Sequence, residues 1–300
     1  MTKIVDLSQA TADQIRALQL KELEILKYVA ELCVAHGLTY YMCGGTCIGT
    51  IRHHGFIPWD DDVDIFMVRE DYEKLYHKWT SYSTDPKYEL CRSDAIHNYH
   101  HAAMTVNDSS TTFINLRTQN EDVNQGIAID IIPIDHQAPT VWKRMTQRLN
   151  AILFSIFINQ RLPDHQGRFL RALTALPLNM VKSPKTRYRI WKKAEKRMTK
   201  PQPNSKNLVE LVSGMKGLFR TFDPDWFAST IQMPFEDTMM PVMVGYDQYL
   251  TLVFHDYMTI PPKNEQLAKH KTAMIDTETP YLQYRGTEYL VSDPESRAHA

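Results

Sequence analysis

The chain has 300 residues, of which 43% are hydrophobic and 23% charged, and its formal net charge is −1. These values are typical of a folded globular protein with a sizeable core, and they exclude a disordered or fibrous chain. The longest apolar run, residues 151–158, is far shorter than the roughly 20 residues that span a bilayer. With no secretory signal and four cysteines in no disulfide or metal pattern, we expect a cytoplasmic protein with reduced thiols.

The first third of the sequence predicts alternating helices and strands. Apolar residues at helical spacing predict a helix over 8–36, with Gly37 as its C-cap. The following segments predict a strand over 38–43, a short helix over 46–52, a strand over 63–68 and a helix over 70–81.

The next segment favours short strands, at 88–91, 101–106, 111–114 and 126–134. The last of these reads Gly-Ile-Ala-Ile-Asp-Ile-Ile-Pro-Ile and places Asp130 among isoleucines. A buried carboxylate without a charge partner is costly, so we expect Asp130 to meet a cation.

The second half changes in composition. Residues 140–200 predict helices broken by prolines and carry fifteen Lys/Arg against two acids, a net charge of +13. Short strands over 218–243 and a helix over 245–254 follow. We therefore predict four parts: a core over 1–138, a basic helical insertion over 139–204, a return to the catalytic unit over 205–275, and a loosely ordered tail over 276–300.

A dense acidic cluster precedes the strand at 63–68. Side chains alternate along a strand, so Asp60, Asp62 and Asp64 are expected on one face, with Asp61 pointing away to a solvated or helix-capping role. Asp62 and Asp64 are the strongest metal candidates, and Asp60 would either join them as a ligand or orient a ligand from outside. Asp130 would supply a third carboxylate from a neighbouring strand, and such a set suits two Mg²⁺ ions, with Mn²⁺ as the alternative.

A glycine pair lies one short helix before the cluster. Gly44 and Gly45, with Thr46, allow close backbone approach to phosphate groups, and the following helix presents its N-terminal N–H groups. Arg52 and His53 lie between this turn and the acids, where they are expected to contact phosphate oxygens. His270 is a further site candidate. Cys43 and Cys47 flank the glycines, but buried packing is favoured over a zinc site.

These residues resemble a known family. Gly44-Gly45-Thr46 with Gly49, followed by the run from Arg52 to Ile65, is similar to the signature of the LicD family of phosphotransferases. Residues 126–135 resemble the second block of that family, and residues 249–270 a looser third block. The resemblance implies an α/β (α+β) fold of nucleotidyltransferase type: a small mixed β-sheet flanked by helices, here with the basic helical insertion.

The resemblance also implies an activity. LicD proteins are similar to enzymes that move phosphocholine from CDP-choline to cell-surface glycans such as lipopolysaccharide or teichoic acid, with release of CMP. We therefore expect catalytic and metal-binding roles for Asp62, Asp64 and Asp130. A CDP-alcohol donor, CDP-choline above all, and a glycan or lipid-linked polysaccharide acceptor are the expected partners, without nucleic acid. Residues 140–200 would make peripheral contact with the inner face of the membrane.

Other functions stay open at this point. The fold would also serve a nucleotidyltransferase that moves NMP from an NTP, or an enzyme that transfers ribitol or glycerol phosphate. A protein without catalysis that binds a membrane or an anionic polymer through residues 140–200 is the remaining alternative.

Overall fold

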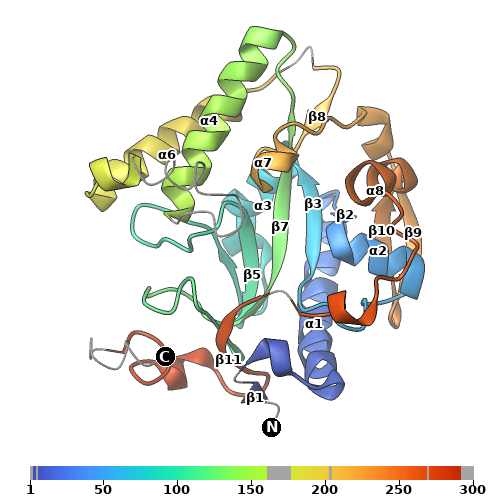
Figure 1. Ribbon diagram of the computed structural model, residues 1–300, viewed down its shortest axis with the longest axis vertical. Coiled ribbons are helices and arrows are strands. Elements are labelled where there is room, and N and C mark those ends of the chain that lie inside the picture. The colour runs from blue at the N-terminus through green and yellow to red at the C-terminus, as the bar shows by residue number, and fades with distance from the viewer. Residues whose placement is uncertain (1–2, 5, 161–176, 203–204, 269, 292–300) are drawn as a thin grey trace. The chain divides into compact units, whose positions relative to one another are not determined.

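Figure 1 shows the computed structural model, which describes residues 3–4, 6–160, 177–202, 205–268 and 270–291. Its contacts divide the chain into two compact units. Unit 1 comprises Met1–Cys91, Thr105–Ile131 and Asp225–Ala300, and unit 2 comprises Arg92–Met104 and Ile132–Pro224. The mixed α/β fold predicted from the sequence is confirmed. The four predicted domain boundaries stay a prediction.

The main sheet carries strands from the first half of the chain. Its strand order is β2 (Tyr41–Met42), β3 (Asp64–Val68), β7 (Ile127–His136), β5 (Met104–Asp108) and β4 (Tyr88–Cys91). β3 and β7 lie side by side at its centre (Figure 1). β3 buries Ile65, Phe66 and Met67, and β7 buries four isoleucines, as expected for the middle of a sheet.

Two further strand groups belong to unit 1. β1 (Lys3–Ile4), β11 (Thr272–Asp276) and β6 (Thr112–Asn115) pair in that order, all antiparallel. β9 (Thr230–Phe235) and β10 (Thr238–Met243) form an antiparallel hairpin. The helices of this unit are α1 (Ala12–His36), α2 (Gly44–His53), α3 (Arg69–Tyr82) and α8 (Tyr246–Phe254).

The ends of α1 are set by local side chains. Thr11 and Gln14 form a capping box, in which each side chain bonds the backbone N–H of the other residue. The helix therefore begins at Ala12, and the prediction of a start at residue 8 is wrong. Gly37 ends the helix in the left-handed region, at φ 62°, as predicted.

The C-terminal segment is packed. Residues 276–291, predicted as part of a loosely ordered tail, instead contribute to a small core of Ile114, Met274 and Tyr289. The Tyr289 ring is fully buried, and the Tyr284 hydroxyl donates to Asp276 at 2.8 Å. Aromatic burial therefore holds this segment where its polar composition predicted a loose tail.

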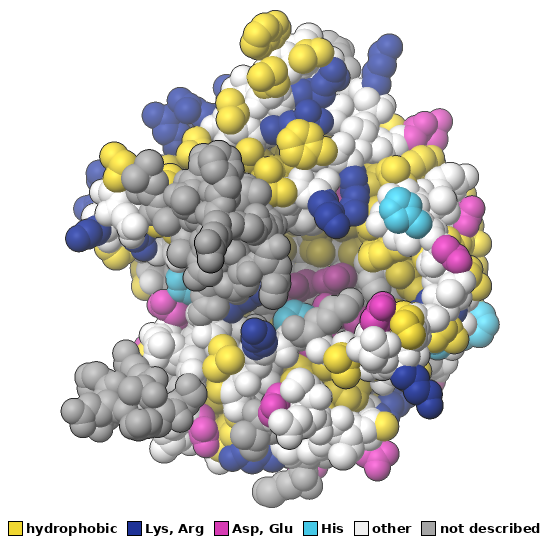
Figure 2. All heavy atoms as spheres, in the orientation of Figure 1, with side chains coloured by type: hydrophobic (Ala, Val, Ile, Leu, Met, Phe, Trp, Pro, Cys, Tyr) yellow, Lys and Arg dark blue, Asp and Glu magenta, His cyan; other side chains and the backbone are white. Residues whose placement is uncertain are grey.

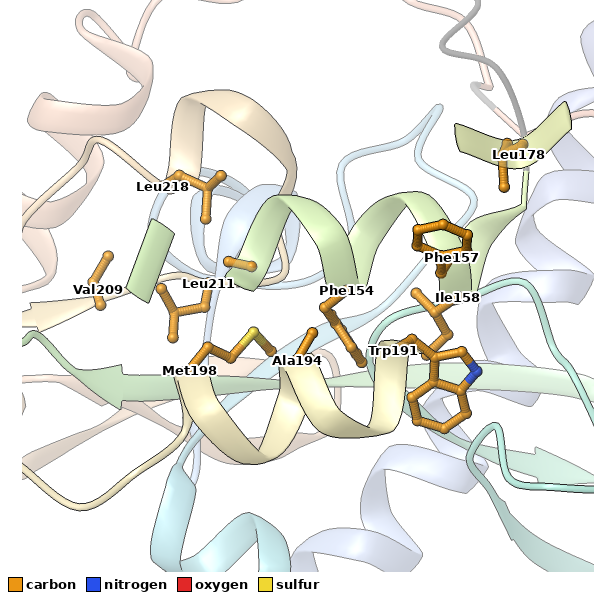
Figure 3. Close-up of a cluster of buried hydrophobic side chains, with 11 residues drawn as sticks. Phe154, Phe157, Ile158, Leu178, Trp191, Ala194, Met198, Val209, Leu211 and Leu218 are labelled. Carbon is orange, nitrogen blue, oxygen red and sulfur yellow. The ribbon is translucent and has the colours of Figure 1, made fainter. Parts of the chain in front are cut away.

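Unit 2 is built around two packed helices, α4 (Val141–Asn159) and α6 (Pro184–Met198), with β8 (Leu208–Val209) and α7 (Gly214–Gly217) beside them. Figure 3 shows its core, where Phe154 and Phe157 of α4 lie with Trp191 of α6. Inside this unit, the buried Glu195 accepts a hydrogen bond from Arg92 at 2.8 Å.

Two sequence expectations concern the whole chain. In the part of the chain that the structure describes, no helix combines the length and apolarity needed to cross a membrane. All four cysteines are buried thiols. Burial raises the pKa of the Cys47 thiol to about 12, which opposes a zinc-binding thiolate there.

Candidate active site

The site lies in unit 1, on the loop between α2 and β3. One oxygen from each of Asp60, Asp61 and Asp62 lies within 4.8 Å of the others. Asp60 and Asp61 are buried, and Asp62 is half-buried. Three carboxylates so close together repel one another, and among the described residues this is the set that fits a cation.

The predicted alternation of side chains does not hold across this loop. β3 begins only at Asp64, so residues 60–63 are not strand and need not point to alternate faces. The prediction of a solvated or helix-capping Asp61 is therefore wrong, since this side chain is 2% exposed and belongs to the cluster.

A buried amide on α1 holds the loop in place. The Gln19 side chain donates to the carbonyl of Ile57 at 3.1 Å and to that of Asp60 at 2.9 Å. Gln19 is 2% exposed, so these bonds are shielded from water and restrain the backbone just before the cluster.

His270 reaches the cluster from the far end of the sequence. Its backbone N–H donates to Oδ2 of Asp61 at 3.0 Å, and its Nδ1 lies 3.2 Å from the same oxygen. The hydrogen bond to Asp61 raises the pKa of His270 to about 9, against the opposing effect of burial, and the charges of Asp62 and Asp130 add to the rise. The structure thus places the His270 candidate at the site.

Asp130 of β7 lies next to the backbone that follows the acidic cluster. Its backbone N–H donates to the carbonyl of Val63 at 2.8 Å, so it lies across from the residue between Asp62 and Asp64. Its charge acts on His270 together with the charges of Asp61 and Asp62. The charge of Asp130 therefore acts near the cluster. Asp64 and Asp130 lie outside the set of Asp60, Asp61 and Asp62 whose oxygens come within 4.8 Å, so a cation shared by Asp62, Asp64 and Asp130 stays a prediction.

Glu22 is a buried carboxylate that the sequence reasoning missed. It is 1% exposed on α1, and its Oε2 has no hydrogen-bond partner among the described residues. Burial raises the pKa of Glu22 well above its usual range, and the charges of Asp62, Asp61, Asp60 and Asp130 raise it further. A buried acid facing four others needs either a proton or a cation.

The glycine pair makes room for carboxylates. A Cβ on Gly45 would lie 2.6 Å from Oδ2 of Asp60, and one on Gly44 would lie 3.2 Å from Oδ2 of Asp64. Gly44 also has a φ of +55°, which favours glycine. The start of α2 therefore faces acidic side chains, and its N-terminal dipole favours negative charge there.

Hydrogen bonds of Thr46 and Tyr249 connect the start of α2 to β3 and to α8. The Thr46 hydroxyl accepts from the backbone N–H of Asp64 at 2.9 Å, and the Gly44 N–H donates to the Tyr249 hydroxyl at 3.1 Å. α2, β3 and α8 are thereby fixed at one point. The predicted contacts of Gly44, Gly45 and Thr46 with donor phosphates stay a prediction.

Arg52 and His53 lie at the other end of α2. The Arg52 guanidinium donates to the carbonyls of Tyr257 at 2.7 Å and Thr259 at 3.1 Å. Burial lowers the pKa of Arg52, and burial together with the neighbouring Arg52 lowers that of His53. Arg52 therefore orders the loop after α8, and a phosphate contact by either residue stays a prediction.

The residues present fit a hard divalent cation. The donors are all carboxylate oxygens, which Mg²⁺ and Mn²⁺ prefer, and the orphaned Oε2 of Glu22 lacks a partner that a cation would supply.

One signal in the sequence could have revealed the missed residues. Gln19 and Glu22 occupy the same helical face as Ile15, Leu18 and Leu26, which are all buried. Polar residues three apart within an apolar face of a helix indicate buried partners.

Part of this chain matches a known family, and most of it matches a characterised relative. Residues 37–159 match the family model described as LicD/FKTN/FKRP, nucleotidyltransferase domain. The chain is 27% identical over 264 residues to the lipopolysaccharide cholinephosphotransferase LicD of Haemophilus influenzae, covering 85% of this chain and 96% of that protein.

Shorter matches reach other relatives. The human and mouse ribitol 5-phosphate transferases FKRP are 42% identical over 48 residues, which is 16% of this chain and 10% of theirs. An uncharacterised Rickettsia typhi protein is 36% identical over 72 residues, 23% of each chain. The resemblance predicted from the motifs is confirmed. Over residues 37–159 the chain is thus similar to the LicD/FKTN/FKRP nucleotidyltransferase domain.

Proposed function

We propose that this phosphotransferase moves a phospho-alcohol, phosphocholine above all, from a CDP-activated donor to a cell-surface glycan and releases CMP. The observation that carries the proposal is the packing of Asp60, Asp61 and Asp62 within 4.8 Å on the loop between α2 and β3, where the charge of Asp130 also acts. The likeness to a lipopolysaccharide cholinephosphotransferase along 96% of its length supports the choice of phosphocholine.

Mg²⁺, as two ions, or Mn²⁺ would be held by Asp62, Asp64 and Asp130, as the resemblance to the family implies. Asp60 and Asp61 cluster with Asp62, and the charges of Asp62 and Asp130 act on the buried Glu22. When bound, such ions neutralise the charge on the phosphates of the donor and on the leaving CMP. The acidic cluster alone would repel a diphosphate, so the chain's own carboxylates need that cation before a donor can bind.

The remaining site residues would position the substrates. The start of α2 at Gly44–Thr46 would receive the donor phosphates, since a helix N-terminus favours anions. Asp130 would accept the proton of an acceptor hydroxyl. Arg52, bound to two loop carbonyls, would hold the segment at residues 257–259 beside the donor.

The test is product analysis with the purified full-length chain, Mg²⁺ and a glycan acceptor. CDP-choline, CDP-ribitol, CDP-glycerol and CDP-ethanolamine are compared, and so is CTP. Release of CMP with transfer of the alcohol phosphate supports the proposal, whereas pyrophosphate release from CTP would assign a nucleotidyltransferase instead. Asp62→Ala and Asp64→Ala should abolish transfer, and Asp13→Asn, an exposed acid on α1, should not.

Ribitol phosphate transfer is the second candidate. The 42% identity over 48 residues to ribitol 5-phosphate transferases favours it. A donor screen by thermal shift distinguishes the two, because the donor that binds best raises the melting temperature most. In either case we infer a cytoplasmic enzyme whose acceptor is carried at the inner face of the membrane.

A further inference from the structure

α4 in unit 2 has two apolar faces instead of one. Its inner face, with Phe154 and Phe157, packs into the core of unit 2. Its other face is exposed and carries five large apolar side chains, which we call the outer stripe: Val141 (60% exposed), Trp142 (78%), Met145 (48%), Leu149 (59%) and Leu153 (41%).

The spacing shows that the outer stripe is one continuous face. Val141, Met145, Leu149 and Leu153 follow one another at intervals of four residues, and residues four apart lie above one another on a helix. A surface helix ordinarily presents polar residues opposite its buried face. The outer stripe is therefore an apolar surface that an ordinary surface helix lacks.

Cations border the outer stripe. α4 contains Lys143, Arg144 and Arg148 and has no Asp or Glu. The Arg148 guanidinium donates to the carbonyl of Leu218 at 2.9 Å and lies 4.8 Å from the centre of the Phe219 ring. Phe219 is 60% exposed, so it extends the apolar surface next to this arginine. Figure 2 shows hydrophobic and basic side chains gathered over the first turns of α4, at the top of the view.

We propose that the outer stripe docks on an anionic lipid surface, with α4 lying in the plane of the interface. A helix with apolar residues on one face and Lys/Arg along its border enters the boundary between headgroups and acyl chains in this way. Trp142, the most exposed member, suits that boundary, where tryptophan is enriched. The net charge of +13 over residues 140–200 adds long-range attraction to anionic headgroups.

Other occupants fit the charges and the apolar residues less well. An acidic polymer would use the cations and leave the apolar side chains in water. A second copy joined through the same stripe would bring Lys143, Arg144 and Arg148 of each chain together, with no acid on α4 to pair with them. A membrane uses both features at once.

The test is co-sedimentation of the full-length chain with vesicles. Equal parts of phosphatidylglycerol and phosphatidylcholine should bind the protein at least about tenfold more tightly than pure phosphatidylcholine, and salt should weaken the binding. The triple variant Trp142→Ser, Met145→Ser, Leu149→Ser should lose at least about tenfold in affinity, since its apolar area is gone.

Matched variants distinguish a specific contribution of the outer stripe from the effect of any substitution or any loss of positive charge. Met145→Leu with Leu149→Met keeps the apolar area and should bind as the wild type does. Lys143→Gln with Arg144→Gln should weaken binding to anionic vesicles, whereas Lys78→Gln with Arg117→Gln, at exposed sites in unit 1, should not. Unchanged melting temperatures would establish that each variant is folded.

Several results would overturn the proposal. These are no binding to anionic vesicles, equal binding to neutral ones, or full binding by the triple variant. A dimer in sedimentation velocity that the triple variant abolishes, without vesicle binding, would assign the stripe to a second copy of the chain.

Discussion

Oδ2 of Asp61 lies within hydrogen-bond distance of both the backbone N–H and Nδ1 of His270, at 3.0 and 3.2 Å. This pair ties the segment before β11 to the acidic loop before β3, across 209 residues of sequence. It also places a positive charge next to carboxylates that otherwise repel one another. His270 is therefore a built-in partner of the cluster.

The pair should make stability depend on pH. A histidine whose pKa rises on folding, here to about 9, contributes stability that is complete below its unfolded pKa and is lost as the pH rises toward 9. His270→Gln should lower the free energy of unfolding by roughly 1–2 kcal/mol near pH 6.5 and flatten its fall up to pH 9. Urea unfolding with a chelator present measures this.

His77→Gln is the control, since that side chain is 70% exposed. It should leave both the free energy of unfolding and its pH dependence as in the wild type. A His270→Gln variant that keeps the wild-type slope between pH 7 and 9 would contradict the assignment.

Glu22 should act in opposite directions on stability and on metal binding. A carboxylate whose pKa is raised on folding costs stability as the pH rises above its ordinary range, so Glu22→Gln should stabilise the metal-free protein by roughly 1–3 kcal/mol at neutral pH. The same change should reduce the rise in melting temperature that Mg²⁺ produces, because a buried anion near the ion is gone.

Glu24→Gln is the matched control on the same helix. Glu24 faces solvent, where it pairs with Lys21 at 3.2 Å, so this variant should change neither the metal-free stability nor the Mg²⁺ response appreciably. If Glu22→Gln lowered the metal-free melting temperature, Glu22 would have a purely structural partner instead.

Gly45→Ala should damage the site even though alanine favours helices. Within a helix, replacing glycine by alanine ordinarily gains about 0.5–1 kcal/mol. Here the added Cβ would lie 2.6 Å from Oδ2 of Asp60, a distance that forces the carboxylate to move. We expect lower stability and at least about tenfold lower transfer activity.

A double-mutant cycle locates the cause. In an Asp60→Ser background, the stability cost of Gly45→Ala should largely disappear, because the clashing oxygen is gone. A cost that persists undiminished would mean that the backbone, and not Asp60, requires glycine at this position.

Two neighbouring ion pairs of the β9–β10 turn should differ in strength. Glu236 binds Arg16 through both oxygens and accepts the N–H of Phe56 at 3.0 Å, and its side chain is 17% exposed. Glu236→Ala should cost about 1–3 kcal/mol of unfolding free energy. Asp237→Ala should cost much less than Glu236→Ala, because Asp237 pairs with Lys27 at the surface and is 69% exposed. Equal losses in urea unfolding would contradict this difference.

Sequence patterns predicted the elements that depend on local signals. α3 and β4 lie where the apolar spacing places them, and Gly37 caps α1 as predicted. The side-chain directions of the acidic loop were not predictable, because strand alternation does not apply to residues 60–63. Contacts over long sequence separations, such as that of Asp61 with His270, leave no local pattern at all.

The discontinuity of unit 2 has a consequence for truncation and proteolysis of the chain. The chain enters it at Arg92–Met104, leaves, and returns at Ile132–Pro224. Deleting residues 140–200 would remove the helices that pack against Val209, Leu211 and Leu218. The exposed apolar side chains would make the remaining chain prone to aggregation. A single proteolytic cut therefore cannot release unit 2 as one intact piece.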